Sequence, residues 1–277
     1  LLISITMLFG GLSFSLAMSA EPMLRGIVPR LIASQSMLVL PMLACAFLTP
    51  APFREMLPVR RIRFSSFLLT VAATVLIYPA IIVINLITLV FTSNRAVEIG
   101  IEAMDLPLWA SILLIGIFGP FCEELVFRGY LLRNLSASGR TMAACFVSAL
   151  LFAVAHGNMN QAAYAFFFGV FLAMLARAAG SVTAGFISHA LFNSFEVIVM
   201  YSFDDTIVQE TGSGISLIDI LQAQGISGME WIYVIIAAVV YSVFAVILAV
   251  LAFLIIIKVR KIEERAGSAV DADNAAE

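Results

Sequence analysis

The chain has 277 residues, of which 62% are hydrophobic and only 12% are charged, and its mean hydropathy is +1.07. Soluble globular domains carry about 25% charged residues, so this composition excludes a protein that faces water over its whole surface. We therefore expect an all-α, polytopic bundle of about eight transmembrane helices in a lipid bilayer. The net charge of −3 says little about partners, and we expect no nucleic acid among them.

Eight apolar stretches approach or exceed the length needed to cross a bilayer. They cover residues 1–20, 31–48, 64–91, 106–135, 141–156, 162–178, 182–201 and 231–257. The first ends in AMSA before Glu21, which is typical of a signal-peptide cleavage site, but it lacks the basic start of such a peptide. We expect a membrane anchor there, with a signal peptide as the alternative.

These stretches predict five regions. They are N-terminal transmembrane helices over 1–106, a catalytic core over 107–201, an extracytoplasmic loop over 202–230, a last transmembrane helix over 231–257 and a disordered cytoplasmic tail over 258–277. The tail is predicted to be disordered because it is charged and then small and polar.

Basic residues gather in alternate loops, which predicts the orientation of the chain. They are Arg54, Arg60, Arg61 and Arg63, then Arg133 and Arg140, and finally Lys258, Arg260 and Lys261. The loops at 92–106 and 202–230 are acidic instead. Both termini should therefore face the cytoplasm, and a bacterial inner membrane is the expected location. Arg25 and Arg30 fall on the wrong side of this rule.

The stretch at 121–132 reads FCEELVFRGYLL and places charge inside an apolar helix. Each such charge costs roughly 2.5 to 3.5 kcal/mol at mid-bilayer, so a compensating partner or a function is expected. Arg128 lies on the same helix face as Glu124, four residues away, and can neutralise it. Glu123 lies about 100° around the helix and needs a proton, a metal or a polarised water of its own.

Two further pairs share the same spacing: Phe152 with His156, and His189 with Asn193. These are the only histidines of the chain. The competing interpretation is a buried ion pair that fixes helix register, together with two packing histidines. Glu196 lies on roughly the face of His189, where it would either reach the outer interface or orient a catalytic group.

These motifs, EExxxR, FxxxH and HxxxN, occur in order on separate apolar helices over about 107–200. They resemble those of the type II CAAX prenyl endopeptidase and bacteriocin-processing (CPBP) family of intramembrane proteases. The resemblance implies hydrolysis of a peptide bond in a membrane-associated or lipidated peptide, with Glu123 or Glu124 activating a water molecule. Because Arg128 is expected to pair with Glu124 and neutralise it, Glu123 is the better candidate for the base.

Two roles stay open for the histidines. Glu123, His156 and His189 would form a three-ligand site for a divalent metal, with zinc as the candidate. Alternatively, His189 and Asn193 would donate hydrogen bonds to the oxyanion of the tetrahedral intermediate. The alternative functions are a proton-coupled transporter, disfavoured because no internal repeat is visible, and a non-catalytic protein that binds a membrane partner.

The motif residues make one geometric prediction. Glu123, His156 and His189 should converge on one buried site with Asn193 at its rim. By helix length, His156 lies about 24 Å from Arg140 whereas Glu123 lies about 15 Å from Arg133. Convergence therefore requires the helix at 141–156 to tilt or to begin later than Thr141.

Overall fold

The computed structural model describes residues 26–48, 58–92, 101–137, 139–202, 225 and 230–276. Every regular element within these ranges is helical, which confirms the predicted all-α fold class. The predicted span over residues 1–20 lies outside the described part of the chain, as does most of the 202–230 loop.

The described helices follow the predicted spans closely. They are α2 (Ile27–Leu48), α4 (Phe64–Leu89), a composite helix over Leu108–Ser136, α9 (Thr141–Ala155), α10 (Met159–Ala178), α11 (Val182–Ser202) and α14 (Glu230–Ala276). Six of these seven are long and apolar enough to cross a membrane, and α9, with 15 residues, is shorter.

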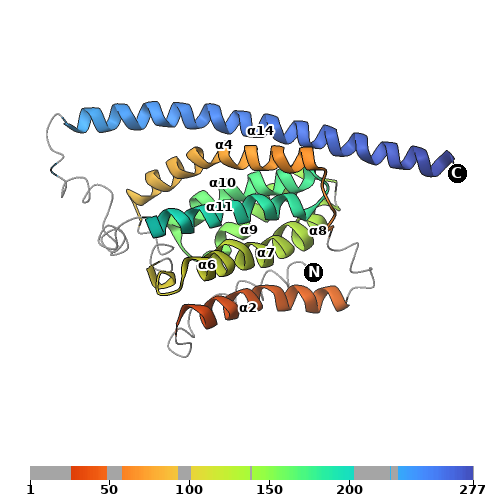
Figure 1. Cartoon of the computed structure of the whole chain (residues 1–277), viewed down its shortest axis with the longest axis horizontal. Coiled ribbons are helices and arrows are strands. Elements are labelled where there is room, and N and C mark those ends of the chain that lie inside the picture. Colours follow the sequence, from red (N-terminus) through yellow and green to blue (C-terminus); the bar gives the residue numbers. More distant parts are fainter. Residues whose placement is uncertain are drawn as a thin grey trace.

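The helices run roughly along one direction in successive layers (Figure 1). α14 packs on α4 at one side, α10 and α11 lie in the middle, and α2 lies at the other side against the composite helix. One apolar core joins α4, α10, α11 and α14 around Phe171 and Leu172, and a second joins α2, α9 and α10 to the composite helix around Phe127 and Phe152. The second core surrounds the charged motif.

The composite helix carries that motif, and its α-helical winding is interrupted by two π-helical stretches. It consists of α6 (Leu108–Ser111), the π-helical η2 (Ile112–Phe118), α7 (Gly119–Glu124), the π-helical η3 (Leu125–Leu131) and α8 (Leu132–Ser136). Pro120 cannot donate a backbone hydrogen bond, and the looser winding of η2 ends at Phe118, two residues before it. The two carboxylates thus lie at the end of a short α-helical turn between two π-helical stretches, a winding that is frequent at functional sites.

The tail differs from its prediction, because α14 continues as a helix to Ala276 instead of ending at Ile257. The segment after Lys258 is rich in Ala, Glu, Arg and Lys, which favour helix. Arg260 also pairs with Glu264 one turn later, a spacing that adds to helix stability.

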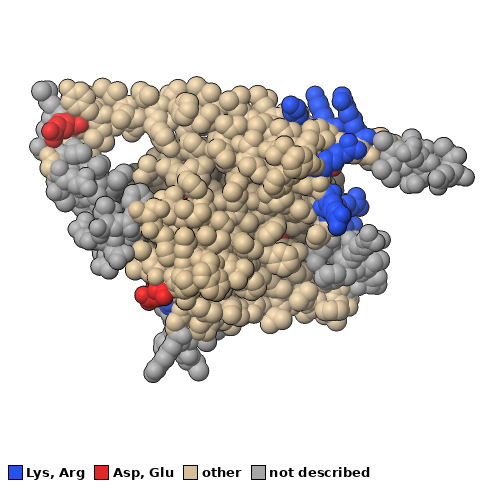
Figure 2. All heavy atoms as spheres, viewed as in Figure 1, with Lys and Arg blue, Asp and Glu red and all other residues tan. Residues whose placement is uncertain are grey.

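Charged side chains gather at opposite ends of the bundle. Figure 2 shows Lys and Arg at one end and Asp and Glu at the other, with a surface of other residues between them. Arg30 is the exception, and it forms an ion pair with Glu102 at the acidic end. Its partner explains how Arg30 is accommodated on the side where the charge rule does not expect it.

Candidate active site

Glu124 and Arg128 form a fully buried ion pair within the composite helix. Glu124 Oε1 lies 2.8 Å from Arg128 Nη1, and both side chains are completely shielded from solvent. The guanidinium also donates from Nη2 to the carbonyl of Gly169, 3.3 Å away on α10, and lies 4.2 Å from the centre of the Phe152 ring. Arg128 therefore joins three helices around Glu124.

The same carboxylate holds His189 of α11. His189 Nδ1 lies 2.9 Å from Glu124 Oε1 and the ring is buried. Because an ionised carboxylate only accepts hydrogen bonds, this contact assigns the donor proton to Nδ1. The second ring nitrogen, Nε2, therefore points away from Glu124, toward the other side of the imidazole ring.

Glu123 lies on that other side. Its Oε2 is 3.7 Å from His189 Nε2, and its side chain is 18% exposed where Glu124 has no exposure at all. Its second oxygen, Oε1, accepts a hydrogen bond from Gln35 Nε2 of α2 at 3.2 Å. The two adjacent glutamates thus occupy different environments: one is enclosed by charge partners, and the other is open to an incoming molecule.

His156 comes close to this group through the Phe152 ring. The centre of that ring is 4.7 Å from the centre of the His156 ring and 5.5 Å from that of His189. The α9 helix begins at Thr141, so a later start does not explain the approach. His156 Nδ1 lies 2.7 Å from the carbonyl of Phe152 instead, which places the imidazole one turn back along its own helix.

Asn193 lies one turn after His189 on α11 and is partly buried. Its Nδ2 donates to the carbonyl of Ile115 in η2 at 3.3 Å. Glu196, three residues further, accepts a hydrogen bond from the hydroxyl of Tyr78 and is exposed on the surface of the bundle. This contact leads away from the motif residues, so Glu196 does not orient them.

Two glycines allow the helices to approach this closely. A Cβ atom on Gly185 would lie 2.6 Å from Glu124 Oε2, and one on Gly169 would lie 3.1 Å from both Ala149 and Phe152. Gly185 therefore leaves the space into which the buried carboxylate fits. Neither glycine was identified from the sequence, because the need for a missing side chain depends on contacts between helices.

The donors only partly match the predicted metal site. Glu123 and His189 present an oxygen and a nitrogen to each other, and Glu124 orients the ring as a partner behind a metal-binding histidine does. Among the described residues, however, no three His, Cys, Asp or Glu side chains are arranged to hold a metal ion. The predicted set with His156 as third ligand is not assembled in this arrangement.

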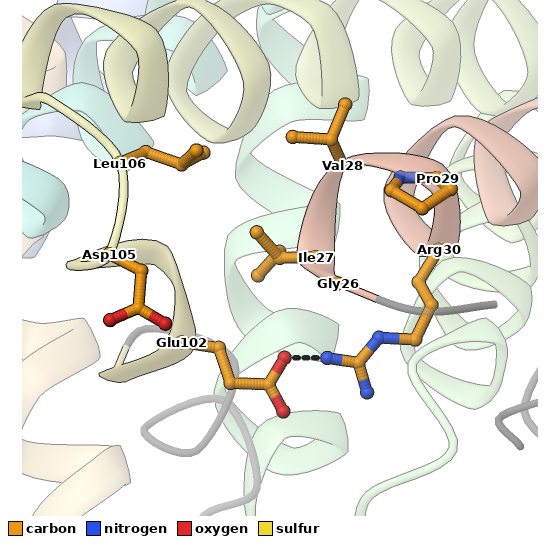
Figure 3. A pocket seen from close by; sticks show the side chains of 8 residues that line it. All are labelled: Gly26, Ile27, Val28, Pro29, Arg30, Glu102, Asp105 and Leu106. Atoms are coloured by element: carbon orange, nitrogen blue, oxygen red, sulfur yellow. Dashed lines mark ion pairs between the residues drawn. The ribbon is translucent and has the colours of Figure 1, made fainter.

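A separate hollow of about 530 Å³ lies at the acidic end of the bundle. It is bounded by the start of α2 and by residues 102–106, and the Arg30–Glu102 ion pair crosses it (Figure 3). None of the motif residues lines this hollow, so it is not part of the candidate active site.

Residues 105–195 match the family model described as type II CAAX prenyl endopeptidase, Rce1-like. The matched segment contains all three motifs and confirms the resemblance seen in the sequence. No curated protein and no solved structure matches the chain. The match thus covers the composite helix, α9, α10 and most of α11, and leaves α2, α4 and α14 outside it.

Proposed function

We propose that this chain is an intramembrane endopeptidase that cuts a membrane-associated or lipidated peptide with a water molecule activated by Glu123. One observation carries the proposal: His189 stands between two glutamates of unequal environment. Glu124 holds Nδ1 of the ring from a fully buried position, and Glu123 faces Nε2 and is partly open. A general base needs this access, whereas an orienting carboxylate needs enclosure.

In the proposed reaction, a water molecule lies beside Glu123 Oε2 and His189 Nε2. Their separation of 3.7 Å is too long for a good direct hydrogen bond and suits two groups that share a water. Glu123 takes one proton from the water, and the oxygen attacks the carbonyl carbon of the scissile peptide. The proton then passes to the leaving amine nitrogen as the C–N bond breaks, which returns Glu123 to its ionised form.

The developing oxyanion needs hydrogen-bond donors. Asn193 has an amide with two N–H groups, and its contact with the Ile115 carbonyl engages the Nδ2 atom through one of them. His156 donates from Nδ1 to the Phe152 carbonyl, and His189 donates from Nδ1 to Glu124, so Nε2 of each neutral ring is an acceptor and could donate to the oxyanion only in a doubly protonated ring. We therefore assign oxyanion stabilisation to Asn193.

Participation of a divalent cation stays a prediction, with zinc as the candidate. Glu123 and His189 would hold it, and His156 would join them only after a rearrangement. Such an ion would polarise the scissile carbonyl or lower the pKa of a bound water. Metal content of the purified protein, compared between the wild type and His189→Ala, measures this directly and does not depend on activity.

The decisive test is Glu123→Gln in liposomes, with a farnesylated C-terminal peptide and an unlipidated hydrophobic peptide library as substrates. We expect the wild type to cleave at least one of these substrates and the variant to cleave none. The melting temperature should not change, because removing the charge of Glu123 leaves no buried opposite charge unpaired. Full activity of the variant would remove Glu123 as the base. An inactive wild type would instead favour a carrier, since paired Glu and His inside a membrane also serve proton transport.

A further inference from the structure

The α2 helix, which lies outside the matched segment, supplies a polar group to the candidate site. Gln35 Nε2 donates to Glu123 Oε1 at 3.2 Å. The buried residues Met42, Cys45 and Ala46 of α2 belong to the apolar core around Phe127. An amide in an apolar spanning helix is costly to bury, so its contact with a site carboxylate points to a role there.

The orientation of this amide follows from its partner. A carboxylate accepts hydrogen bonds and cannot donate them, so Gln35 must turn its NH₂ group toward Glu123. Its carbonyl oxygen, Oε1, then lies on the far side of the amide, where it is buried and has no hydrogen-bond partner among the described residues. Gln35 therefore meets Glu123 through the donor end of its amide.

We propose that Gln35 positions Glu123 through the hydrogen bond from its Nε2 to Glu123 Oε1; this rests on the proposed function. The bond holds the carboxylate in one orientation, with Oε2 turned toward His189 Nε2. One O–H of the water points to Glu123 Oε2 and loses its proton. The other O–H points to His189 Nε2, which accepts because the ring proton is on Nδ1, and a lone pair on the oxygen is left to attack the peptide carbonyl carbon.

Three variants in the full-length chain separate this role from simple packing. Gln35→Met keeps the length of the side chain and removes the hydrogen bond to Glu123. Gln35→Glu keeps the shape and donates to Glu123 only while the introduced carboxyl is protonated. Ser34→Ala is the control, because the Ser34 hydroxyl donates to the Leu31 carbonyl of its own helix and, within the described residues, to no group of the site.

We expect Gln35→Met to lower kcat about 10- to 100-fold, the range seen when the partners behind site residues are removed, with KM nearly unchanged. Gln35→Glu should retain activity at low pH and lose it as the pH rises, because two facing carboxylates then repel each other. The wild type is the reference for this profile, because both proteins keep the same charged and ionisable neighbours: Glu123, Glu124, Arg128, His156 and His189. Ser34→Ala should match the wild type.

The two proposals fail in different ways. If the wild type cleaves, Glu123→Gln is inactive and Gln35→Met keeps the wild-type kcat, the role of Gln35 is overturned and the proposed function stands. The same conclusion follows if Gln35→Glu shows the wild-type pH profile, or if Gln35→Met loses melting temperature and activity in proportion. If the wild type cleaves no substrate, both proposals fall together.

Discussion

At the scale of single residues, the Glu124–Arg128 pair is held together mainly by the attraction between opposite charges, because its hydrogen bonding is incomplete. Their closest atoms are 2.8 Å apart, yet Nε and Nη1 of Arg128 and Oε2 of Glu124 have no aligned hydrogen bond. Taking both charges out of water costs several kcal/mol per ion, so such a pair is poor evidence for stability. Arg128 and His189 share the Glu124 Oε1 atom, and in the proposed mechanism this pair holds the His189 ring at a fixed angle.

We predict that Glu124→Gln lowers both stability and activity. The change leaves the Arg128 guanidinium buried without a counter-charge, which costs about 3 to 5 kcal/mol. It also removes the carboxylate that fixes the proton on His189 Nδ1. Thermal unfolding in detergent and peptide cleavage in liposomes measure the two effects, and a variant with wild-type melting temperature would contradict the assigned ion pair.

The matched control for that change is the double variant Glu124→Gln with Arg128→Met. Replacing both charges removes the unpaired cation, and Met can occupy the place of the guanidinium beside the Phe152 ring. We expect most of the lost melting temperature to return while cleavage stays low, because His189 still lacks its orienting partner. Recovery of activity along with stability would show that Glu124 matters for folding alone.

The sequence could predict pairs within a helix and not those between helices. The spacing of Glu124 and Arg128 placed them on one face, and the structure has them in contact. The bond from Glu124 to His189 joins residues 65 positions apart, and no periodicity in a single sequence encodes that distance. A polar amide in an apolar span is itself a signal, but Gln35 was not predicted to belong to the site because its partner, Glu123, lies 88 positions away on another helix.

At the scale of helices, close approach of α11 to α7 depends on Gly185. We predict that Gly185→Ala reduces activity and stability, because the added Cβ would lie 2.6 Å from Glu124 Oε2, where no atom can be placed without displacement. Gly119→Ala is the control, since its Cβ meets nothing nearer than 3.6 Å. Cleavage rate and melting temperature should fall for the first variant and stay close to the wild type for the second.

The extension of α14 beyond the membrane span is tied to the start of α4. Glu263 Oε1 accepts hydrogen bonds from the backbone N–H of Arg63, at 3.2 Å, and from the Ser66 hydroxyl. A carboxylate at a helix N-terminus satisfies backbone donors that the helix itself leaves unpaired. The carboxylate of Glu263 thus caps α4 from a distant part of the chain.

We predict that Glu263→Ala destabilises the protein by about 1 kcal/mol, the usual value of an N-terminal cap. The adjacent Glu264→Ala is the control. Glu264 is exposed and, among the described residues, its side chain pairs with Arg260 of its own helix alone, and such a pair contributes about 0.3 to 0.5 kcal/mol. Thermal unfolding compares the two, and equal effects would exclude the cap.

Hydropathy predicted most of the helices because a bilayer requires long apolar stretches. The ends of α4 and α11 differ from prediction by one or two residues, and α2 and α10 begin a few residues earlier than expected. The π-helical winding on both sides of α7 could not be predicted, since it depends on how the helix packs and not on composition. The tail was misjudged because its helix is stabilised partly by Glu263, whose contact with α4 is invisible in the sequence.

At the scale of the whole molecule, the two ends of the bundle carry opposite charge (Figure 2). The exposed basic residues of the described chain include Arg61 before α4, Arg140 before α9 and Lys261 in α14. Glu230, at the start of α14, lies at the acidic end. Because cytoplasmic loops are enriched in Lys and Arg, this arrangement predicts that α14 begins outside the membrane and ends in the cytoplasm.

The last prediction tests this orientation by labelling single cysteines with a membrane-impermeant maleimide in whole cells. The native cysteines, Cys45, Cys122 and Cys145, are buried and should react little. Glu230→Cys should label in intact cells, whereas Lys261→Cys should label only after the membrane is opened. The reverse pattern would invert the bundle and place the Arg30–Glu102 pair on the cytoplasmic side, where an arginine needs no special explanation.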